Sequence, residues 1–361
     1  MSSFAFEKIL VIATHCIGDS LLLSAYTRSL RNAYPQAQLD VLVNERGRMV
    51  FEGNADISNL VIIPSRPKLR DYLRLFKVHG RYDLVVNEML NDRTAIYSAL
   101  FGKVRLGAVD LKSSTAWMKQ RIYQYYIIER NNYEHKMSRC ARMLGLINVD
   151  VIPHLVSPEA TLPKHVQCKL SEDYIVVHTP SSNEIKQWPV EHWHEMLNYL
   201  LDDGYQLVLT GADISRDRQI ASAVIDGIRD RTGWISCVGE LSLAQTSTVI
   251  KNSRGFIGPD SGPGHLASGY LVPLISLISV APASLWSPWP YNHPVNTETN
   301  LYQNRIPVQV VGNVAVLQST RDCVPCYGNK CRISHDHYSP CLVDISPKQV
   351  INTVRKMMPL R

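Results

Sequence analysis

The sequence of 361 residues lacks long apolar runs and has few cysteines for its length. No run approaches the roughly 18 uninterrupted apolar residues that a membrane-spanning helix needs. The first residues carry neither a basic n-region nor a small-residue cleavage site, so we expect a cytoplasmic protein without a secretory signal. Eight cysteines are too sparse for a disulfide scaffold, and a reducing compartment would keep them as thiols or metal ligands.

The composition excludes disordered, collagen-like and coiled-coil proteins. With 45% hydrophobic and 19% charged residues, the chain can bury a sizeable core. Its length favours two domains over one.

Short β-branched runs alternate with amphipathic stretches, and the pattern occurs twice. Strands are expected over 8–14, 39–43, 59–64 and 82–88, and again over 174–180, 205–211, 255–260 and 273–279. Helices are expected over 19–33, 67–79, 91–101 and 134–146, and again over 190–203, 214–229, 242–253 and 262–270. This alternation is typical of βαβ units, so we expect two doubly wound parallel α/β domains with the interdomain linker within 150–172.

Positive charge is concentrated in the first half of the chain. Residues 1–165 hold 22 Lys and Arg against 15 Asp and Glu, whereas the remainder holds 16 against 17. Within 64–81, six basic residues accompany one acid: Arg66, Lys68, Arg70, Arg74, Lys77 and Arg81. The segment is either a solvated helix face or an anion-binding surface. Nucleic acid is not the expected anion, because no stacking aromatics or nucleic-acid-binding motifs accompany the charges.

Two polar clusters directly follow predicted strands, where ligands of parallel sheets bind. Asp19 stands at a helix start, as either an N-cap or a catalytic carboxylate. In the second half, a glycine-rich turn carries Asp260, Ser261, Gly262 and His265. Backbone amides in such a turn can approach a phosphate closely, although the turn alone is a weak signal.

A third cluster follows the strand predicted over 174–180. It contains Thr179 and Lys186, and a helix is expected directly after it. The lysine could neutralise a diphosphate as a point charge, although a loop lysine is usually only solvent-exposed.

Together these clusters resemble the lipopolysaccharide heptosyltransferases of glycosyltransferase family 9 across essentially the whole chain. The matching stretches are 17–43, 185–197, 211–217, 238–250, 260–268 and 323–351. The resemblance implies a GT-B fold, in which two Rossmann-like doubly wound domains face a central cleft. It implies an acceptor-binding domain over 1–160, a domain for the nucleotide sugar over 161–346, and a C-terminal helix over 347–361 that packs back on the first domain.

The resemblance also implies roles for individual residues. Asp19 takes the place of the general base, and Lys186 that of the diphosphate-binding lysine. The other donor-binding residues that it implies are Asp260, Ser261, Gly262 and His265. From its place after a predicted strand we also expect Thr179 to bind the donor, and from the concentration of positive charge we expect Arg66, Lys68 and Arg70 to bind the acceptor. The implied reaction is inverting and needs no catalytic metal. Closure of the two domains is expected to bring the base and the leaving-group site together.

The resemblance further implies the partners. These are ADP-heptose or a similar nucleotide sugar, and an anionic lipid-linked saccharide met at the cytoplasmic face of the inner membrane. Two alternatives stay open. The first is transfer to a protein hydroxyl or from another nucleotide sugar, and the second is a non-catalytic scaffold that binds a nucleotide sugar or a metal.

Four cysteines lie near the C-terminus: Cys323, Cys326, Cys331 and Cys341. They could hold a structural Zn or Fe ion, with His335 and His337 as spare ligands, or they could remain thiols or form a disulfide. Their spacing matches neither a zinc ribbon nor the usual ferredoxin orders. We expect a structural role in either case. The other cysteines are expected to be small apolar fillers.

Overall fold

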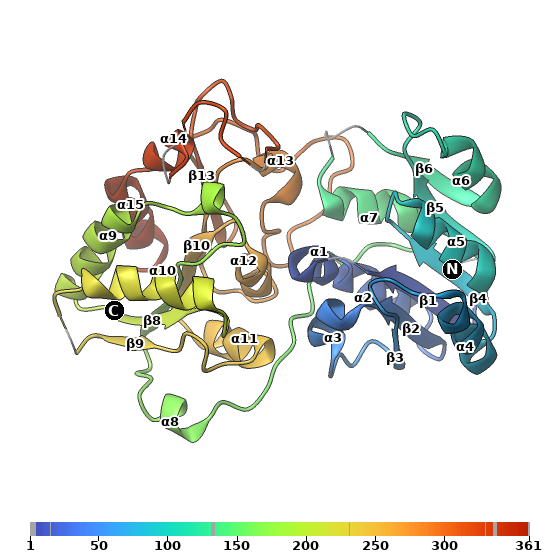
Figure 1. Cartoon of the computed structure of the whole chain (residues 1–361), viewed down its shortest axis with the longest axis horizontal. Helices are drawn as coiled ribbons and strands as arrows, with labels where there is room; N and C mark the ends of the chain where they lie inside the picture. The colour runs from blue at the N-terminus through green and yellow to red at the C-terminus, as the bar shows by residue number, and fades with distance from the viewer. Residues whose placement is uncertain are drawn as a thin grey trace. The chain divides into compact units, whose positions relative to one another are not determined.

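The computed structural model describes residues 5–14, 16–130, 134–230, 232–328, 330–334 and 338–359. The chain forms two compact units (Figure 1). Unit 1 comprises Met1–Pro158 and Pro294–Asn300, and unit 2 comprises Glu159–His293 and Leu301–Arg361. The first change from one unit to the other lies inside the expected linker region. Among the helices that the structure describes, none combines the length and the apolar character of a membrane span.

Unit 1 contains a parallel sheet with the strand order β3-β2-β1-β4-β5-β6. The strands are β1 Lys8–Ala13, β2 Gln38–Val43, β3 Asn59–Ile62, β4 Tyr82–Asn87, β5 Gly102–Val109 and β6 Tyr125–Ile128. In register, Ile9 lies opposite Leu39 of β2 and Leu84 of β4. The apolar runs of β1, β2 and β4 form strands because helices bury them on both faces.

In the described part of unit 1, seven helices accompany this sheet. They are α1 Ile17–Leu22, α2 Ser24–Ala33, α3 Glu45–Phe51, α4 Leu69–His79, α5 Asp92–Phe101, α6 Ala116–Ile122 and α7 Lys136–Gly145. The single helix expected over 19–33 is two helices that meet at Leu23. There the Ser24 hydroxyl donates to the Leu21 carbonyl at 2.5 Å and accepts from the Val156 amide, so a side chain takes over part of the helical bonding.

Unit 2 contains a second, mostly parallel sheet with the order β12-β13-β11-β10-β7-β8-β9. The strands are β7 Tyr174–His178, β8 Gln206–Thr210, β9 Trp234–Ser236, β10 Gly255–Pro259, β11 Leu274–Ile278, β12 Val308–Val311 and β13 Val314–Gln318. Among the described strands of this sheet, only β12 pairs antiparallel, with β13. The strand order reverses direction between β7 and β10, which makes this the topological switch point of the unit.

The helices of unit 2 follow the doubly wound pattern. They are α8 Lys164–Gln167, the 3-10 turn η1 Glu184–Lys186, α9 Val190–Asp202, α10 Ser215–Asp226, α11 Leu243–Lys251, α12 Gly262–Ala267, α13 Ala283–Trp286, α14 Pro340–Val343 and α15 Pro347–Met357. The helix expected over 262–270 ends at Ala267.

Helix α15 belongs to unit 2, which corrects the expectation that the C-terminal helix packs on the first domain. Its apolar stripe of Val350, Ile351 and Val354 is buried in the same core as Trp193 of α9. Figure 1 shows α9 and α15 side by side. The segment of the second half that joins unit 1 is Pro294–Asn300 instead.

Candidate functional site

One candidate site lies at the switch point of unit 2. Thr179 directly follows β7, and Asp260 directly follows β10. The Lys186 Nζ lies 2.6 Å from the Asp260 Oδ2, although 74 positions separate the two residues in the sequence. Their side chains are 25% and 10% exposed. The structure therefore brings together two of the predicted donor-binding residues as an ion pair that a ligand can still reach.

Short-range hydrogen bonds hold the loop that carries Lys186. The Asn183 side chain caps η1 by accepting from the Ile185 amide, and the Ser181 hydroxyl donates to the Asn183 carbonyl at 2.7 Å. The Gln187 side chain donates back to the Ser181 carbonyl at 3.1 Å. Because the loop is bonded to itself, the position of the Lys186 backbone is set before any ligand arrives.

Two buried hydroxyl groups beside this ion pair have no hydrogen-bond partner among the described residues. They are the Thr179 Oγ1 and the Ser261 Oγ. Ser261 is the N-cap of α12 but makes no side-chain cap bond, and Gly262 begins the helix. His265 is buried within α12. Since a buried polar group without a partner is costly, these hydroxyls are suited to bind a polar ligand.

The buried histidine at the end of β7 does not add positive charge to this edge. His178, the last residue of β7, is buried with its Nδ1 3.1 Å from the Thr210 Oγ1. Burial lowers the pKa of His178 to about 4, so its imidazole is neutral at pH 7.

A second cation lies near the Lys186 loop and was missed by the sequence analysis. Arg216 Nη1 donates to the Ser182 carbonyl at 3.1 Å, and the guanidinium also contacts Asp217. Asp217 is buried and accepts from the Ala212 amide, so it orients Arg216. The available signal was the Arg-Asp pair in the stretch 211–217, which follows β8.

Residues 338–345, here called the C-terminal tail, form hydrogen bonds with the segment that carries Lys186. The Ser339 hydroxyl donates to the Ile185 carbonyl at 2.9 Å, and the Trp188 indole donates to the Ile345 carbonyl at 2.8 Å. The Val190 amide donates to the Tyr338 hydroxyl at 3.3 Å. The tail is far from the donor-binding residues in sequence but contacts their supporting loop in the fold.

The four tail cysteines lie near one another. Cys341 is buried in α14, and its pKa is raised to about 12 by burial and by the nearby thiols of Cys323, Cys326 and Cys331. In the part of the chain that the structure describes, no disulfide links them, and no group of three or more His, Cys, Asp or Glu is arranged to hold a metal ion. His335 and His337 lie outside the described residues. A structural metal therefore stays a prediction.

The remaining cysteines divide into two kinds. Cys140 and Cys237 are buried, as expected for small apolar fillers. Cys16 and Cys168 are exposed, which corrects that expectation for these two positions.

The tail cysteines are expected to stabilise unit 2. Cys326→Ser should lower the melting temperature, because it removes one thiol from the cluster beside the C-terminal tail that contacts the Lys186 loop. Thermal unfolding with and without a chelator, together with elemental analysis, measures the effect. Cys168→Ser is the matched control, since that thiol is exposed in the same unit. An unchanged melting temperature in Cys326→Ser would contradict the structural role, and four titratable thiols without Zn or Fe would exclude the metal.

Another candidate site belongs to unit 1. Asp19 is half-buried in the first turn of α1, whose N-cap is Cys16. It is therefore not the N-cap itself, which corrects one of the two interpretations of this residue. The neighbouring Ser20 and Leu21 are buried and anchor the helix directly after β1. This places a carboxylate at the carboxyl edge of the first sheet.

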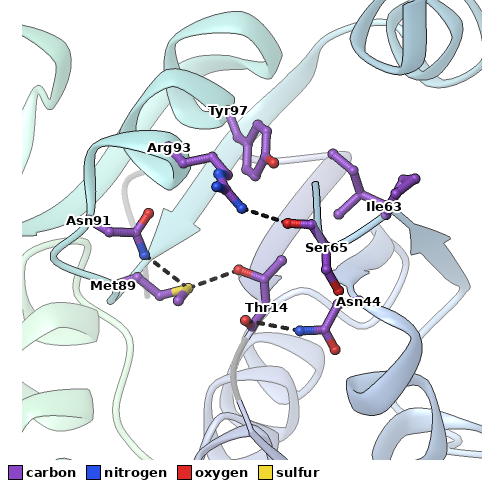
Figure 2. A pocket seen from close by; sticks show the side chains of 9 residues that line it. Thr14, Asn44, Ile63, Ser65, Met89, Asn91, Arg93 and Tyr97 are labelled. Carbon is purple, nitrogen blue, oxygen red and sulfur yellow. Dashed lines mark hydrogen bonds between the residues drawn. The ribbon is translucent and has the colours of Figure 1, made fainter. Parts of the chain in front are cut away.

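The same edge contains a pocket of about 270 Å³ (Figure 2). Its lining residues are Thr14, Asn44, Ile63, Pro64, Ser65, Met89, Asn91, Arg93 and Tyr97. They follow the carboxyl ends of β1 to β4, where ligands of a doubly wound sheet bind. Figure 2 shows Arg93 reaching Ser65, with its Nη1 donating to the Ser65 carbonyl at 2.8 Å. The lining combines polar and apolar side chains, which suits a sugar.

The predicted acceptor residues Arg66, Lys68 and Arg70 do not line this pocket. All three are exposed on the segment that leads from Ser65 into α4. The charged lining residue is Arg93, which the sequence analysis missed because no motif surrounds it.

Known proteins resemble this chain over most of its length. Lipopolysaccharide heptosyltransferase 3 of Escherichia coli K12 is 24% identical over 339 residues, which cover 85% of this chain and 95% of that protein. A glycosyltransferase family 9 structure from Veillonella parvula matches with a TM-score of 0.72 at 18% identity, covering 98% and 97% of the two chains. An Escherichia coli heptosyltransferase solved with ADP matches with a TM-score of 0.68 at 16% identity, covering 97% and 99%.

The structural neighbours confirm the expected GT-B class of two Rossmann-like units. The model of the family described as "Glycosyltransferase family 9 (heptosyltransferase)" matches residues 80–307, which are more than half of the sequence. The chain therefore belongs to glycosyltransferase family 9 and is a glycosyltransferase.

Proposed function

We propose that this glycosyltransferase moves a heptose from ADP-heptose to an inner-core acceptor of lipopolysaccharide, with inversion at the anomeric carbon. The observation that carries the donor half is the ion pair of Lys186 and Asp260 at the switch point of unit 2. The names of the relatives support the choice of sugar and acceptor, since they are lipopolysaccharide heptosyltransferases.

In this proposal, Lys186 offsets the charge of the donor diphosphate. The hydroxyls of Thr179 and Ser261 donate hydrogen bonds to phosphate or ribose oxygens, and the turn at Gly262 lets the backbone approach. Asp260 keeps the ammonium group oriented until the donor binds. These groups would stabilise the departing ADP as the bond to the anomeric carbon breaks.

The proposed base is Asp19. As the anomeric carbon gains positive charge, the acceptor hydroxyl attacks it from the face opposite the diphosphate and gives its proton to the Asp19 carboxylate. Attack from that face inverts the configuration. The base belongs to unit 1 and the leaving-group residues to unit 2, so the reaction requires that the units bring them together.

The acceptor is proposed to bind unit 1. The pocket beside β1 to β4 would take a sugar ring, and Arg93 would meet a phosphate or carboxylate on it. Arg66, Lys68 and Arg70 would attract further anionic groups along the segment that leaves the pocket. We place the reaction at the cytoplasmic face of the inner membrane, where a lipid-linked acceptor would be met.

Reversing the charge of Arg66 and Arg70 should raise the KM for a phosphorylated acceptor. Both side chains are exposed, so the effect should be larger at low salt than at 0.1 M, where the Debye length is about 10 Å. Steady-state kinetics with phosphorylated and neutral acceptor fragments measures it. The control variant is Lys164→Glu with Lys348→Glu, which changes the net charge by the same amount at exposed positions of unit 2. Its KM should match that of the unchanged protein. An equal rise in KM with the neutral fragment would indicate a structural effect instead.

Incubation of the purified protein with ADP-heptose and a core acceptor that lacks heptose tests the function. We expect ADP release and a product heavier by one heptose, with the anomeric configuration opposite to that of the donor. Transfer to a protein, or from a different nucleotide sugar only, would favour the alternative enzymes. Binding of ADP-heptose without turnover would favour the scaffold.

A further inference from the structure

Helix α4 presents an apolar strip to solvent, which is unusual for a helix that covers a sheet. Leu69, Leu73 and Phe76 are 75%, 55% and 44% exposed. They recur at helical spacing and share one face. The side of α4 toward the protein is occupied by Leu75, which is buried, and by Tyr72, whose ring packs on Tyr97 of α5. The exposed strip is therefore not the core-facing side.

The apolar strip continues onto the neighbouring helices of unit 1. The ring of Phe76 lies 6.4 Å from the ring of Phe101 in α5, and Leu100 beside it is exposed. Ile96 of α5 is exposed as well. Helix α6, which packs against α5, exposes Trp117 with the guanidinium of Arg121 over its ring.

A basic strip lies beside the apolar strip of α4. Arg70, Arg74 and Lys77 recur at intervals of three and four residues, and all are exposed. None of these three makes an ion pair or side-chain hydrogen bond with another described residue. The one acid of the segment, Asp71, accepts from the Lys68 amide at 2.8 Å and so serves the start of the helix.

We propose that α4 docks on the surface of an anionic lipid bilayer. Leucine and phenylalanine side chains would enter the boundary between headgroups and acyl chains, and the basic strip would contact lipid phosphates. Charge complementarity favours an anionic bilayer as the partner, because the unpaired cations of the basic strip lie directly beside the side chains of the apolar strip. A purely electrostatic partner such as an acidic polypeptide would leave the apolar strip in water.

This inference goes beyond the proposed sugar transfer and does not depend on it. If the proposed function holds, docking has a consequence for the acceptor. Helix α4 follows the pocket residue Ser65 directly through Arg66 to Lys68, so a docked α4 would hold the pocket near the surface that carries the lipid-linked substrate.

Sedimentation of the full chain with vesicles tests the proposal in the absence of any sugar substrate. We expect binding to phosphatidylcholine vesicles that contain phosphatidylglycerol, weak binding to phosphatidylcholine alone, and weaker binding at high salt. Arg74→Ala with Lys77→Ala should weaken binding by roughly 30-fold, since each basic residue near such a surface contributes appreciably. Leu69→Glu with Leu73→Glu should abolish it.

Matched controls distinguish docking from general effects. Leu271→Glu introduces one such Leu→Glu change at a position of unit 2 that is 72% exposed, and Lys164→Ala with Lys348→Ala removes two exposed charges there. Both controls should bind vesicles as the unchanged protein does. Transfer to a neutral water-soluble acceptor fragment and the melting temperature should be unchanged in the α4 variants, which separates docking from catalysis and folding.

Three results would overturn the proposal. One is a folded, unchanged protein that does not bind the anionic vesicles. Another is full binding by Leu69→Glu with Leu73→Glu, which would show that the apolar strip is not used. The third is equal binding of the unchanged protein to polyglutamate and to the vesicles, with the same loss in the charge variant, which would indicate an acidic polypeptide partner.

Discussion

Asp19→Asn is expected to slow sugar transfer by about 10²- to 10⁴-fold, the usual loss when a general base is removed. The amide keeps the size and polarity of the side chain in the first turn of α1 but cannot accept the acceptor's proton. The affinity for ADP should change little, because the donor-binding residues belong to unit 2. Steady-state turnover and calorimetry with ADP measure the two quantities.

The matched control for Asp19→Asn is Glu45→Gln. Glu45 is an acid in the first turn of α3, which follows β2 as α1 follows β1. Both substitutions remove a favourable charge near a helix N-terminus, worth about 0.3–1 kcal/mol. Similar turnover in both variants would leave Asp19 only its role in complementing the helix dipole.

Lys186→Ala is expected to weaken ADP binding by about 10- to 100-fold, since a hydrogen bond to a charged group contributes roughly 1.5–3 kcal/mol. The change also leaves the carboxylate of Asp260 without its partner at 2.6 Å, which adds negative charge where the diphosphate should bind. Lys186→Arg keeps the charge and should recover part of the affinity. A large side chain introduced at Gly262 should also weaken ADP binding, because it would occupy the space of the diphosphate.

Lys251→Ala controls for the loss of an ion pair in unit 2. Lys251 Nζ lies 2.7 Å from Glu159 Oε2, a distance close to that of the Lys186 pair, but on the exposed side of α11. The ADP affinity of Lys251→Ala should match that of the unchanged protein. If calorimetry gives unchanged ADP affinity in Lys186→Ala and in the Gly262 variant, the donor binds elsewhere.

The sequence predicted most of the strands that are buried on both faces, such as β1, β7 and β11, because continuous apolar runs identify them. It missed β5, where Lys103 and Arg105 interrupt the run, and β6, which is only four residues long. It also missed the antiparallel pair of β12 and β13. Strands at a sheet edge, such as β6 and β12, and strands of mixed polarity, such as β5, lack the period that sequence reasoning relies on. Strand β13 has the apolar run of a buried strand and was overlooked.

The candidate site was predictable only where a motif marks it. Lys186 and Asp260 each follow a recognisable strand, and the structure brings them together. The unit 1 pocket is assembled from four separate strand ends, and residues such as Thr14 and Arg93 are ordinary polar residues in sequence. The contact of Ser339 with the Lys186 loop depends on tertiary packing, which no local pattern records.

Mass spectrometry of core oligosaccharide tests the central claim most directly. We compare cells that have this protein, cells that lack it, and cells that carry only the Asp19→Asn form. The account predicts that core oligosaccharide lacks one heptose without the protein, that the unchanged protein restores it, and that Asp19→Asn does not. An identical core in all three strains would contradict heptosyl transfer to lipopolysaccharide.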